Sequence, residues 1–388
     1  MTDRESAAGG PPGGAGAGFC ERCGADLPPQ AAADAEPASS PEEPALGGSG
    51  EPAAGPEEPA AGPEEPTADH GRTSATHVVR NRSAGPRACR ECGGEVDQDG
   101  YCTQCGAAAP KERDHFELRA STWVGGVCDR GIRHRRNEDA AAVLAEGSGI
   151  TGQAALVVCD GVSSADDSDV ASLAAARAAA EAIGTGSLGL AEGSALAAAL
   201  RRRIEAGAAA AATAVARATA DGATNPPSCT FVAAAVRGSV VVLGVVGDSR
   251  AYWLPDDGEQ VILTLDDSVA GQQIAAGRPR AEAEAGPQAH AIVRWIGVDS
   301  PDQTPRLTAL DVDRPGWLLL CSDGLWNYAS KAADVRAVLD DALLAGGADP
   351  VRTASAMVDW ANEQGGHDNI TVVLARLDLD RNEGVDPA

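Results

Sequence analysis

Aromatic residues, lysine and long apolar segments are scarce in this chain of 388 residues. Phe, Trp and Tyr make up 3% of it, so a core must be built from small aliphatic side chains on closely spaced elements. Lysine occurs only at Lys111 and Lys331, a bias that, with abundant Ala, Gly and Pro, is typical of a GC-rich bacterial genome. No segment approaches the ~20 apolar residues of a membrane span, and the N-terminus lacks the pattern of a signal peptide. We therefore predict a cytoplasmic protein with no membrane partner.

Positive charge is also in deficit. The chain has 31 Lys and Arg against 57 Asp and Glu, which gives a net charge of -26. Such a field repels polyanions, so we predict no nucleic-acid partner. The chain also lacks the Cys-x5-Arg phosphate loop of a cysteine phosphatase, because none of its ten cysteines is followed by Arg six positions later.

Six of the ten cysteines form three Cys-x-x-Cys pairs, which are Cys20/Cys23, Cys89/Cys92 and Cys102/Cys105. Nine residues separate the second pair from the third, and Gly follows the last Cys of each. Four thiolates at this spacing can close a tetrahedron around Zn²⁺, so we predict a structural zinc ribbon over residues 87–110. The first pair lies in residues 1–27, which we expect to be largely disordered. It lacks a local second pair, and its sequence leaves open whether it binds zinc.

Residues 28–86 are rich in Pro, Glu and Ala. Between Ala31 and Asp69 there are ten acidic residues and no Lys or Arg, and Pro-Glu-Glu-Pro recurs three times. Frequent proline forbids helix, and few large apolar side chains are present to form a core. We predict a disordered, self-repelling linker.

Residues 116–380 carry the pattern of a large folded domain. Expected strands are 121–128, 140–145, 154–159, 230–237, 239–246, 251–254, 260–263, 317–321 and 370–377. Expected helices are 170–183, 194–220, 331–344 and 350–363, with Arg201–Arg203 on a solvated face of the second. Strands come in hairpin-like clusters and helices in pairs, which favours an α+β fold with two antiparallel β-sheets flanked by helix pairs.

Acidic residues recur where these apolar runs begin or end. The clusters are Asn137-Glu138-Asp139, Asp160-Gly161, Gly247-Asp248-Ser249-Arg250, Ser322-Asp323-Gly324 and Gly366-His367-Asp368-Asn369. Taken singly, the Asp-Gly and Gly-Asp pairs in these clusters are common turn formers. A fold that gathers them makes a pocket that is repulsive unless cations fill it. Oxygen ligands favour Mg²⁺ or Mn²⁺, so the pattern predicts a hydrolytic centre built on hard metal ions.

The order and spacing of these motifs resemble the metal-dependent protein phosphatases of the protein phosphatase 2C type. The resemblance also covers Gly131–Ala140, Leu265–Ser268 and Ile370–Val373. It implies an αββα sandwich, two Mn²⁺ or Mg²⁺ ions, and hydrolysis of phosphoserine or phosphothreonine in proteins, opposing bacterial Ser/Thr kinases. Hydroxide formed near neutral pH would attack phosphorus in line, without a covalent phosphoenzyme.

The resemblance also implies roles for individual residues. Asp160 should bridge both metals with help from the Gly161 carbonyl, and Asp139 should hold one of them, partly through water. Asp323 and Asp368 should hold the other, and Asp248 matches the position of a third, weaker metal. The stretch Asp266–Arg294 corresponds to a variable flap that shapes substrate access.

The chain departs from the family pattern at two places. His134 occupies the position of an arginine that usually grips the phosphate, and His cannot form the bidentate contact. Arg133 or Arg136 can take over this role, and our hypothesis is Arg133. After Gly161 the usual Met-Gly-Gly is replaced by Val162-Ser-Ser, followed by three additional aspartates.

The sequence leaves two functions open. One is an active phosphatase whose partners are phosphorylated proteins, such as a Ser/Thr kinase or its substrates. The alternative is a non-catalytic zinc-ribbon adaptor with a pseudophosphatase domain. Retention of Asp139, Asp160, Asp323 and Asp368 favours the enzyme, because a non-catalytic protein has little chemical reason to keep four mutually repelling carboxylates.

Overall fold

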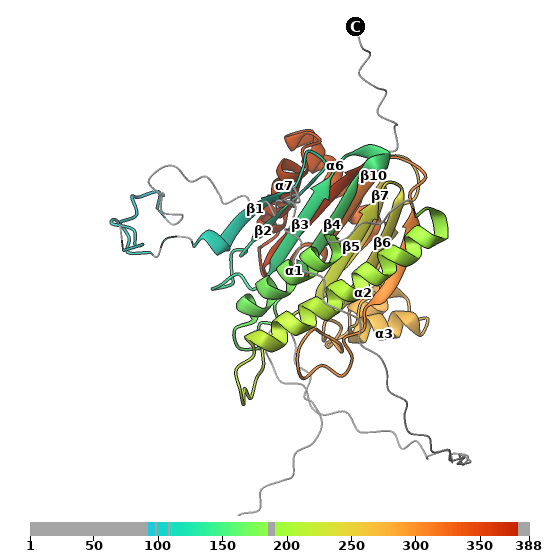
Figure 1. Ribbon diagram of the computed structural model, residues 1–388. Coiled ribbons are helices and arrows are strands. Elements are labelled where there is room, and N and C mark those ends of the chain that lie inside the picture. Colours follow the sequence, from blue (N-terminus) through green and yellow to red (C-terminus); the bar gives the residue numbers. More distant parts are fainter. Residues whose placement is uncertain (1–91, 98, 108, 110, 185–190, 379–388) are drawn as a thin grey trace, which may run out of the picture.

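The computed structural model describes residues 92–97, 99–107, 109, 111–184 and 191–378 (Figure 1). The segments 1–27 and 28–86 lie outside the described residues, as do Cys20, Cys23 and Cys89. The described domain has two antiparallel sheets, as predicted, and each is covered by helices on its outer face.

The first sheet has the strand order β1-β2-β11-β10-β7-β8. Its strands are β1 (His115–Arg119), β2 (Val124–Asp129), β7 (Arg250–Pro255), β8 (Val261–Ile262), β10 (Gly316–Cys321) and β11 (Ile370–Leu377). In the centre of this sheet Leu319 pairs with Leu374 on one side and Tyr252 on the other, and all three are buried.

The second sheet has the order β3-β4-β5-β6-β9. Its strands are β3 (Ala140–Glu146), β4 (Gln153–Cys159), β5 (Phe231–Arg237), β6 (Val240–Val246) and β9 (Arg306–Asp311). The apolar runs that predicted β4, β5 and β6 are buried on both faces, because one face meets the other sheet and the other meets helices.

Four long helices complete the layers. They are α1 (Ser168–Gly184), α2 (Gly193–Ala218), α6 (Ala332–Gly346) and α7 (Pro350–Glu363). Figure 1 shows α1 and α2 crossing the second sheet, with α6 and α7 behind the first. Short helices η1 (Glu112–Asp114), η2 (Gly149–Thr151), α3 (Val269–Ala275), α4 (Arg280–Glu284) and α5 (Asp323–Trp326) lie between the main elements.

Small residues let the layers approach closely, as the composition predicted. A side chain at Gly244 of β6 would collide with Ile204 of α2, and one at Gly207 would lie 2.7 Å from Ile183 of α1. The core between α1, α2 and the sheet is correspondingly rich in alanine. Close spacing therefore replaces aromatic bulk in this layer.

The structure corrects several expected boundaries. The strand predicted at 121–128 begins only at Val124, and a separate strand β1 precedes it. Strand β9 and helices α3 to α5 were not predicted. Strand β9 pairs only with β6 and has no fully buried residue, so its pattern gives little signal.

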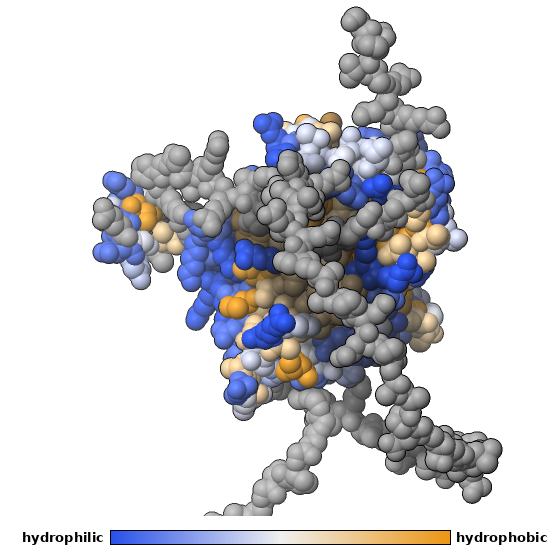
Figure 2. Space-filling model, viewed as in Figure 1, coloured by the Kyte–Doolittle hydropathy of each residue, from blue (hydrophilic) through white to orange (hydrophobic). Residues whose placement is uncertain are grey.

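Hydrophilic side chains surround smaller apolar areas on the face shown in Figure 2. Large apolar residues that are exposed, such as Ile132, Val170 and Leu344, are scattered among the elements. None of the helices in the described ranges has the length and apolar character needed to cross a bilayer.

Candidate metal centre

The two sheets bring the predicted carboxylates to one end of the sandwich. Ala140 of β3 pairs with Cys159 of β4, so Asp139 and Asp160 flank the same end of the second sheet. In the first sheet Cys321 of β10 pairs with Val372 of β11, which places Asp323 and Asp368 at a common end. Four positions spread over 230 residues of sequence therefore meet because antiparallel neighbours start and stop at the same edge.

Asp139 is fully buried, and its two carboxylate oxygens differ in their surroundings. Oδ2 accepts hydrogen bonds from the hydroxyls of Ser322 and Thr371, both at 2.7 Å. Oδ1 accepts no hydrogen bond from the residues that the structure describes. Burial raises the pKa of this carboxyl, although the hydrogen bonds from Thr371 and Ser322 oppose the shift. A buried carboxylate oxygen without a partner is costly and fits a position prepared for a cation.

Asp323 and Asp368 repel one another across this centre. Burial, and then the neighbouring Asp323, raise the pKa of Asp368 to about 8. Burial and Asp139 likewise raise the pKa of Asp323. Burial is the main cause of both shifts and repulsion between neighbouring carboxylates adds to it, so a nearby cation would favour the ionised form of these groups.

Asp160 is partly exposed and lies within hydrogen-bonding reach of Asp139. Its backbone N–H donates to the Thr230 hydroxyl at 3.0 Å, and its carbonyl accepts from the Thr230 N–H at 2.7 Å. A side chain at Gly161 would come within 2.6 Å of the Glu138 carbonyl and 3.0 Å of that of Ser168. Glycine is therefore required there for the turn that presents Asp160.

Asp248 lies in the loop between β6 and β7 and is completely buried. Within the described ranges, neither of its carboxylate oxygens has a hydrogen-bond partner. Burial raises its pKa, and Asp323 and Asp266 add to the shift. The geometry therefore matches a further cation ligand better than a surface hairpin turn, which would leave the carboxylate in water.

The side chains of residues 133, 134 and 136 lie in three different environments. His134 lies 3.2 Å from Asp368 and 3.8 Å from Glu138, and both carboxylates raise its pKa. Arg136 pairs with Glu138 at 2.7 Å. The exposed Arg133 side chain makes no hydrogen bond or ion pair within the described part of the chain, so its guanidinium is available for a ligand.

Glu138 connects this segment to α1 and is itself strongly ionised. Burial would raise its pKa, but hydrogen bonds from His134, Ser163 and Ser168 outweigh burial and lower it to about 2. The altered loop after Gly161 thus contributes Ser163 and Ser168 to the support of this carboxylate. The loop also contains Asp167, whose φ of 50° is unusual for a residue other than glycine.

Sequence reasoning missed several residues that hold the ligands in place. Arg113 donates to the carbonyls of Asn137, Asp139 and Asp169 at 3.0, 3.1 and 2.6 Å. The Asn369 amide donates to the carbonyls of Arg130 and Arg136 and accepts from the Glu138 N–H. Asn369 could have been found because it belongs to the motif Gly366-His367-Asp368-Asn369. Nothing in the sequence around Arg113 predicts a contact with the Asp139 carbonyl, 26 residues away.

The cysteines of the two-sheet domain are buried beside the strands. Burial raises the pKa of Cys128, Cys159 and Cys321, so these thiols are poor nucleophiles at neutral pH. In the N-terminal segment, by contrast, Cys92, Cys102 and Cys105 place their sulfur atoms within 4.8 Å of one another. A backbone hydrogen bond from Cys105 is the main reason that the pKa of Cys102 is lowered to about 6.

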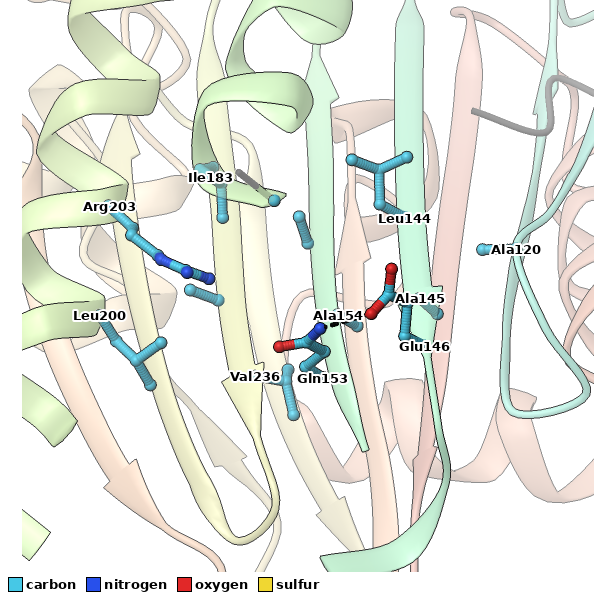
Figure 3. A pocket seen from close by; sticks show the side chains of 13 residues that line it. Ala120, Leu144, Ala145, Glu146, Gln153, Ala154, Ile183, Leu200, Arg203 and Val236 are labelled. Atoms are coloured by element: carbon cyan, nitrogen blue, oxygen red, sulfur yellow. Dashed lines mark hydrogen bonds between the residues drawn. The ribbon is translucent and has the colours of Figure 1, made fainter. Parts of the chain in front are cut away.

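A cavity of about 300 Å³ lies at the opposite end of β3 and β4 from the carboxylates (Figure 3). Gln153 donates to Glu146 at 2.7 Å in its wall, and the guanidinium of Arg203 points towards it. The prediction that Arg201–Arg203 lie on a solvated face is wrong for Arg201 and Arg203, because both side chains are half-buried. The cavity contains none of the predicted site residues.

The fold and the carboxylate cluster define an α–β–β–α domain with a candidate centre for hard metal ions. The family model of protein phosphatase 2C matches residues 131–360. The chain belongs to this family. This assignment confirms the resemblance seen in the sequence.

Relatives named as serine/threonine phosphatases are similar to parts of the chain. "Serine/threonine phosphatase stp" of Listeria innocua is 31% identical over 156 residues, which is 40% of this chain and 59% of that protein. The protein of the same name from Listeria welshimeri is 29% identical over 252 residues, 65% of this chain and 94% of that protein. "Protein phosphatase PhpP" of Streptococcus pneumoniae is 36% identical over 133 residues, 34% and 51% of the two chains.

A solved structure has the same architecture. The serine/threonine phosphatase Stp1 from Staphylococcus aureus superposes with a TM-score of 0.53 at 25% identity, covering 68% of this chain and 98% of that chain. The fold extends over the domain that carries the carboxylates, and residues 1–91 are outside the described part of the chain.

Proposed function

We propose that the chain hydrolyses phosphoserine and phosphothreonine in proteins, with Mn²⁺ or Mg²⁺ as cofactor, and that it opposes Ser/Thr kinases in bacterial signalling. One observation carries the proposal: Asp139, Asp160, Asp323 and Asp368 come from separate segments and converge on one end of the sandwich. Family membership and the names of the relatives support the same activity.

The donor set fits hard cations. Asp160, helped by the Gly161 carbonyl, would serve both ions, Asp139 would hold one of them, and Asp323 and Asp368 would hold the other. Asp248 is our candidate for a third ion, because its two buried oxygens have no hydrogen-bond partner among the residues described. When bound, the ions supply hydroxide near neutral pH and neutralise charge on the phosphoryl oxygens.

The chain's own residues orient the substrate and the ligands. Arg133 is our candidate for the phosphate contact, because Arg136 is engaged by Glu138 and His134 lies between two carboxylates. Ser322 and Thr371 fix Oδ2 of Asp139, which leaves Oδ1 directed to the centre. Asn369 holds the turn around Glu138 against β11, so the ligands on both sheets keep a fixed separation.

We also propose a structural zinc ion in the N-terminal ribbon. Three of its four predicted thiolates lie close together, and a lowered pKa favours the thiolate of Cys102 at neutral pH. Cys89, the fourth predicted ligand, lies outside the described residues, as do Cys20 and Cys23.

The activity is tested with a phosphothreonine peptide and Mn²⁺, comparing the wild-type chain with Asp160→Asn. We expect hydrolysis by the wild type that disappears in the variant and on addition of EDTA. Folded, metal-supplied wild type without activity would reject the phosphatase function. A zinc-ribbon adaptor with a non-catalytic domain would then be the better account.

A further inference from the structure

The cavity at the far end of β3 and β4 from the carboxylates has an apolar floor built from small residues (Figure 3). It occupies about 300 Å³ between the sheet, the end of α1 and the first half of α2. Leu144, Ala155 and Ala235 are cross-strand neighbours on β3, β4 and β5 and form one row of the floor. Because two of the three are alanines, the row leaves space beneath Ile183 of α1 and Leu200 of α2.

The next row of side chains, at the end of the sheet, is polar and hydrogen-bonded across the same three strands. Gln153 of β4 donates to Glu146 of β3 at 2.7 Å, and Arg237 of β5 donates to Gln153 at 3.0 Å. Gln153 is the direct register partner of both residues, so the row is continuous. This row therefore joins one carboxylate to one guanidinium through a neutral amide at the rim of the cavity.

Arg203 of α2 adds a second guanidinium to the rim. Figure 3 shows its side chain extending from the helix towards the cavity. Burial lowers the pKa of Arg203 and the positive charge of Arg237 adds to the shift, so the two guanidiniums repel one another. Arg203 and Arg237 against Glu146 give two positive charges and one negative charge, which leaves a surplus of one positive charge at the rim.

We propose that this cavity binds a small amphipathic carboxylate, with its apolar part between Leu144 and Leu200 and its carboxylate on Arg203. A volume at the lower end of the range for small-molecule sites suits a ligand of modest size. The planar guanidinium can hold a carboxylate in a bidentate contact. A single surplus positive charge matches a monoanion, and Glu146 disfavours a dianion such as an alkyl phosphate.

The site is separate from the metal centre. The cavity lies at the opposite ends of β3 and β4 from Asp139 and Asp160, and none of the described residues that line it is a candidate metal ligand. The inference therefore goes beyond the proposed phosphatase function and does not depend on it.

The first test titrates the full chain with octanoate by calorimetry, in EDTA so that no metal ion can bind the carboxylate. We expect saturable binding of about one octanoate per chain with a Kd of about 1 mM or lower. Octanamide has the same alkyl chain without the charge, and octyl phosphate has more charge. Both should bind at least about tenfold more weakly. No saturable binding of octanoate, or an analogue that binds as tightly or more tightly, would overturn the proposal.

Arg203→Met tests where the carboxylate binds. The variant keeps most of the aliphatic length and removes the charge, so octanoate affinity should fall about tenfold or more while octanamide affinity is unchanged. Arg202→Met is the matched control, because Arg202 is the next residue on the same helix and is exposed, and it should bind octanoate like the wild type. An Arg203 variant that binds octanoate like this control would overturn the carboxylate contact.

Two further variants locate the site independently. Ala155→Leu fills part of the cavity and, with its fold checked by circular dichroism, should abolish binding of octanoate and octanamide. Arg133→Ala, which removes a cation beside the carboxylate centre, should leave octanoate binding unchanged. Octanoate binding that persists in a folded Ala155→Leu chain, or that is lost in Arg133→Ala, would place the ligand outside this cavity and reject the proposal.

Discussion

Replacing Arg113 by methionine should weaken both the fold and the metal centre. The guanidinium bridges the loop that carries Asp139 and the start of α1, through the carbonyls of Asn137, Asp139 and Asp169. It also donates to the Ser172 hydroxyl at 3.2 Å. Methionine keeps much of the aliphatic length but removes every donor.

The expected loss of unfolding free energy is about 2–4 kcal/mol. A hydrogen bond to a charged group contributes roughly 1.5–3 kcal/mol, and an unsatisfied buried carbonyl costs about 1–3 kcal/mol. Arg113 is only half-buried, so in the variant water can replace some of its hydrogen bonds to the carbonyls. The expected loss of unfolding free energy is therefore smaller than the sum of these contributions. Displacement of Asp139 should lower Mn²⁺ affinity by roughly 10–100-fold, as for other groups that orient metal ligands.

Urea unfolding in EDTA measures the first effect, and calorimetric titration with Mn²⁺ measures the second. Arg119→Met is the matched control at the other end of β1, where the side chain pairs with Asp349 at 2.6 Å and is 41% exposed. The unfolding free energy of the control should fall by only about 0.5–1 kcal/mol, and its Mn²⁺ affinity should not change. An Arg113 variant that behaves like this control would refute the reasoning.

Three further changes have defined outcomes. The Arg119 side chain lowers the pKa of Asp349 from 3.8 to about 2. The resulting stability is present above the unfolded pKa and is lost as pH falls through the folded value. Asp349→Asn keeps the helix cap, so urea unfolding should show a deficit of about 0.5–1 kcal/mol at pH near 6 that shrinks below pH near 4; a pH-independent deficit would contradict the ion pair. Arg133→Ala should raise KM for the phosphopeptide about tenfold or more, whereas Arg135→Ala, which changes an exposed neighbour, should not; equal KM values in wild type and Arg133→Ala would remove Arg133 from the phosphate site. Cys102→Ser should abolish zinc retention, measured by metal analysis after dialysis, and stoichiometric zinc in the variant would exclude the ribbon.

The layered fold could be predicted because most elements carry strong local patterns. Helix α7 and strand β11 have the predicted bounds, 350–363 and 370–377. Proline and a capping aspartate start α7, and a mainly apolar run marks β11. Strand β1 alternates polar and apolar residues over only five positions, so it was not predicted from the sequence.

The carboxylate ligands could be predicted for a different reason. Each lies where an apolar run begins or ends, so local patterns locate them even though their convergence depends on the whole fold. Residues that act at long range gave no such signal. Arg113 reaches the centre through loop carbonyls, and this contact does not follow from spacing in the sequence.

Binding of Mn²⁺ by calorimetric titration is the most direct test of the central claim, that the strand-end carboxylates form a centre for two or more cations. The account predicts about two or three ions per wild-type chain, fewer in Asp323→Asn, and no change in Asp340→Asn, whose carboxylate is exposed and pairs with Arg336. Wild type that binds no Mn²⁺, or an Asp323 variant that binds as many ions with equal affinity, would contradict the account.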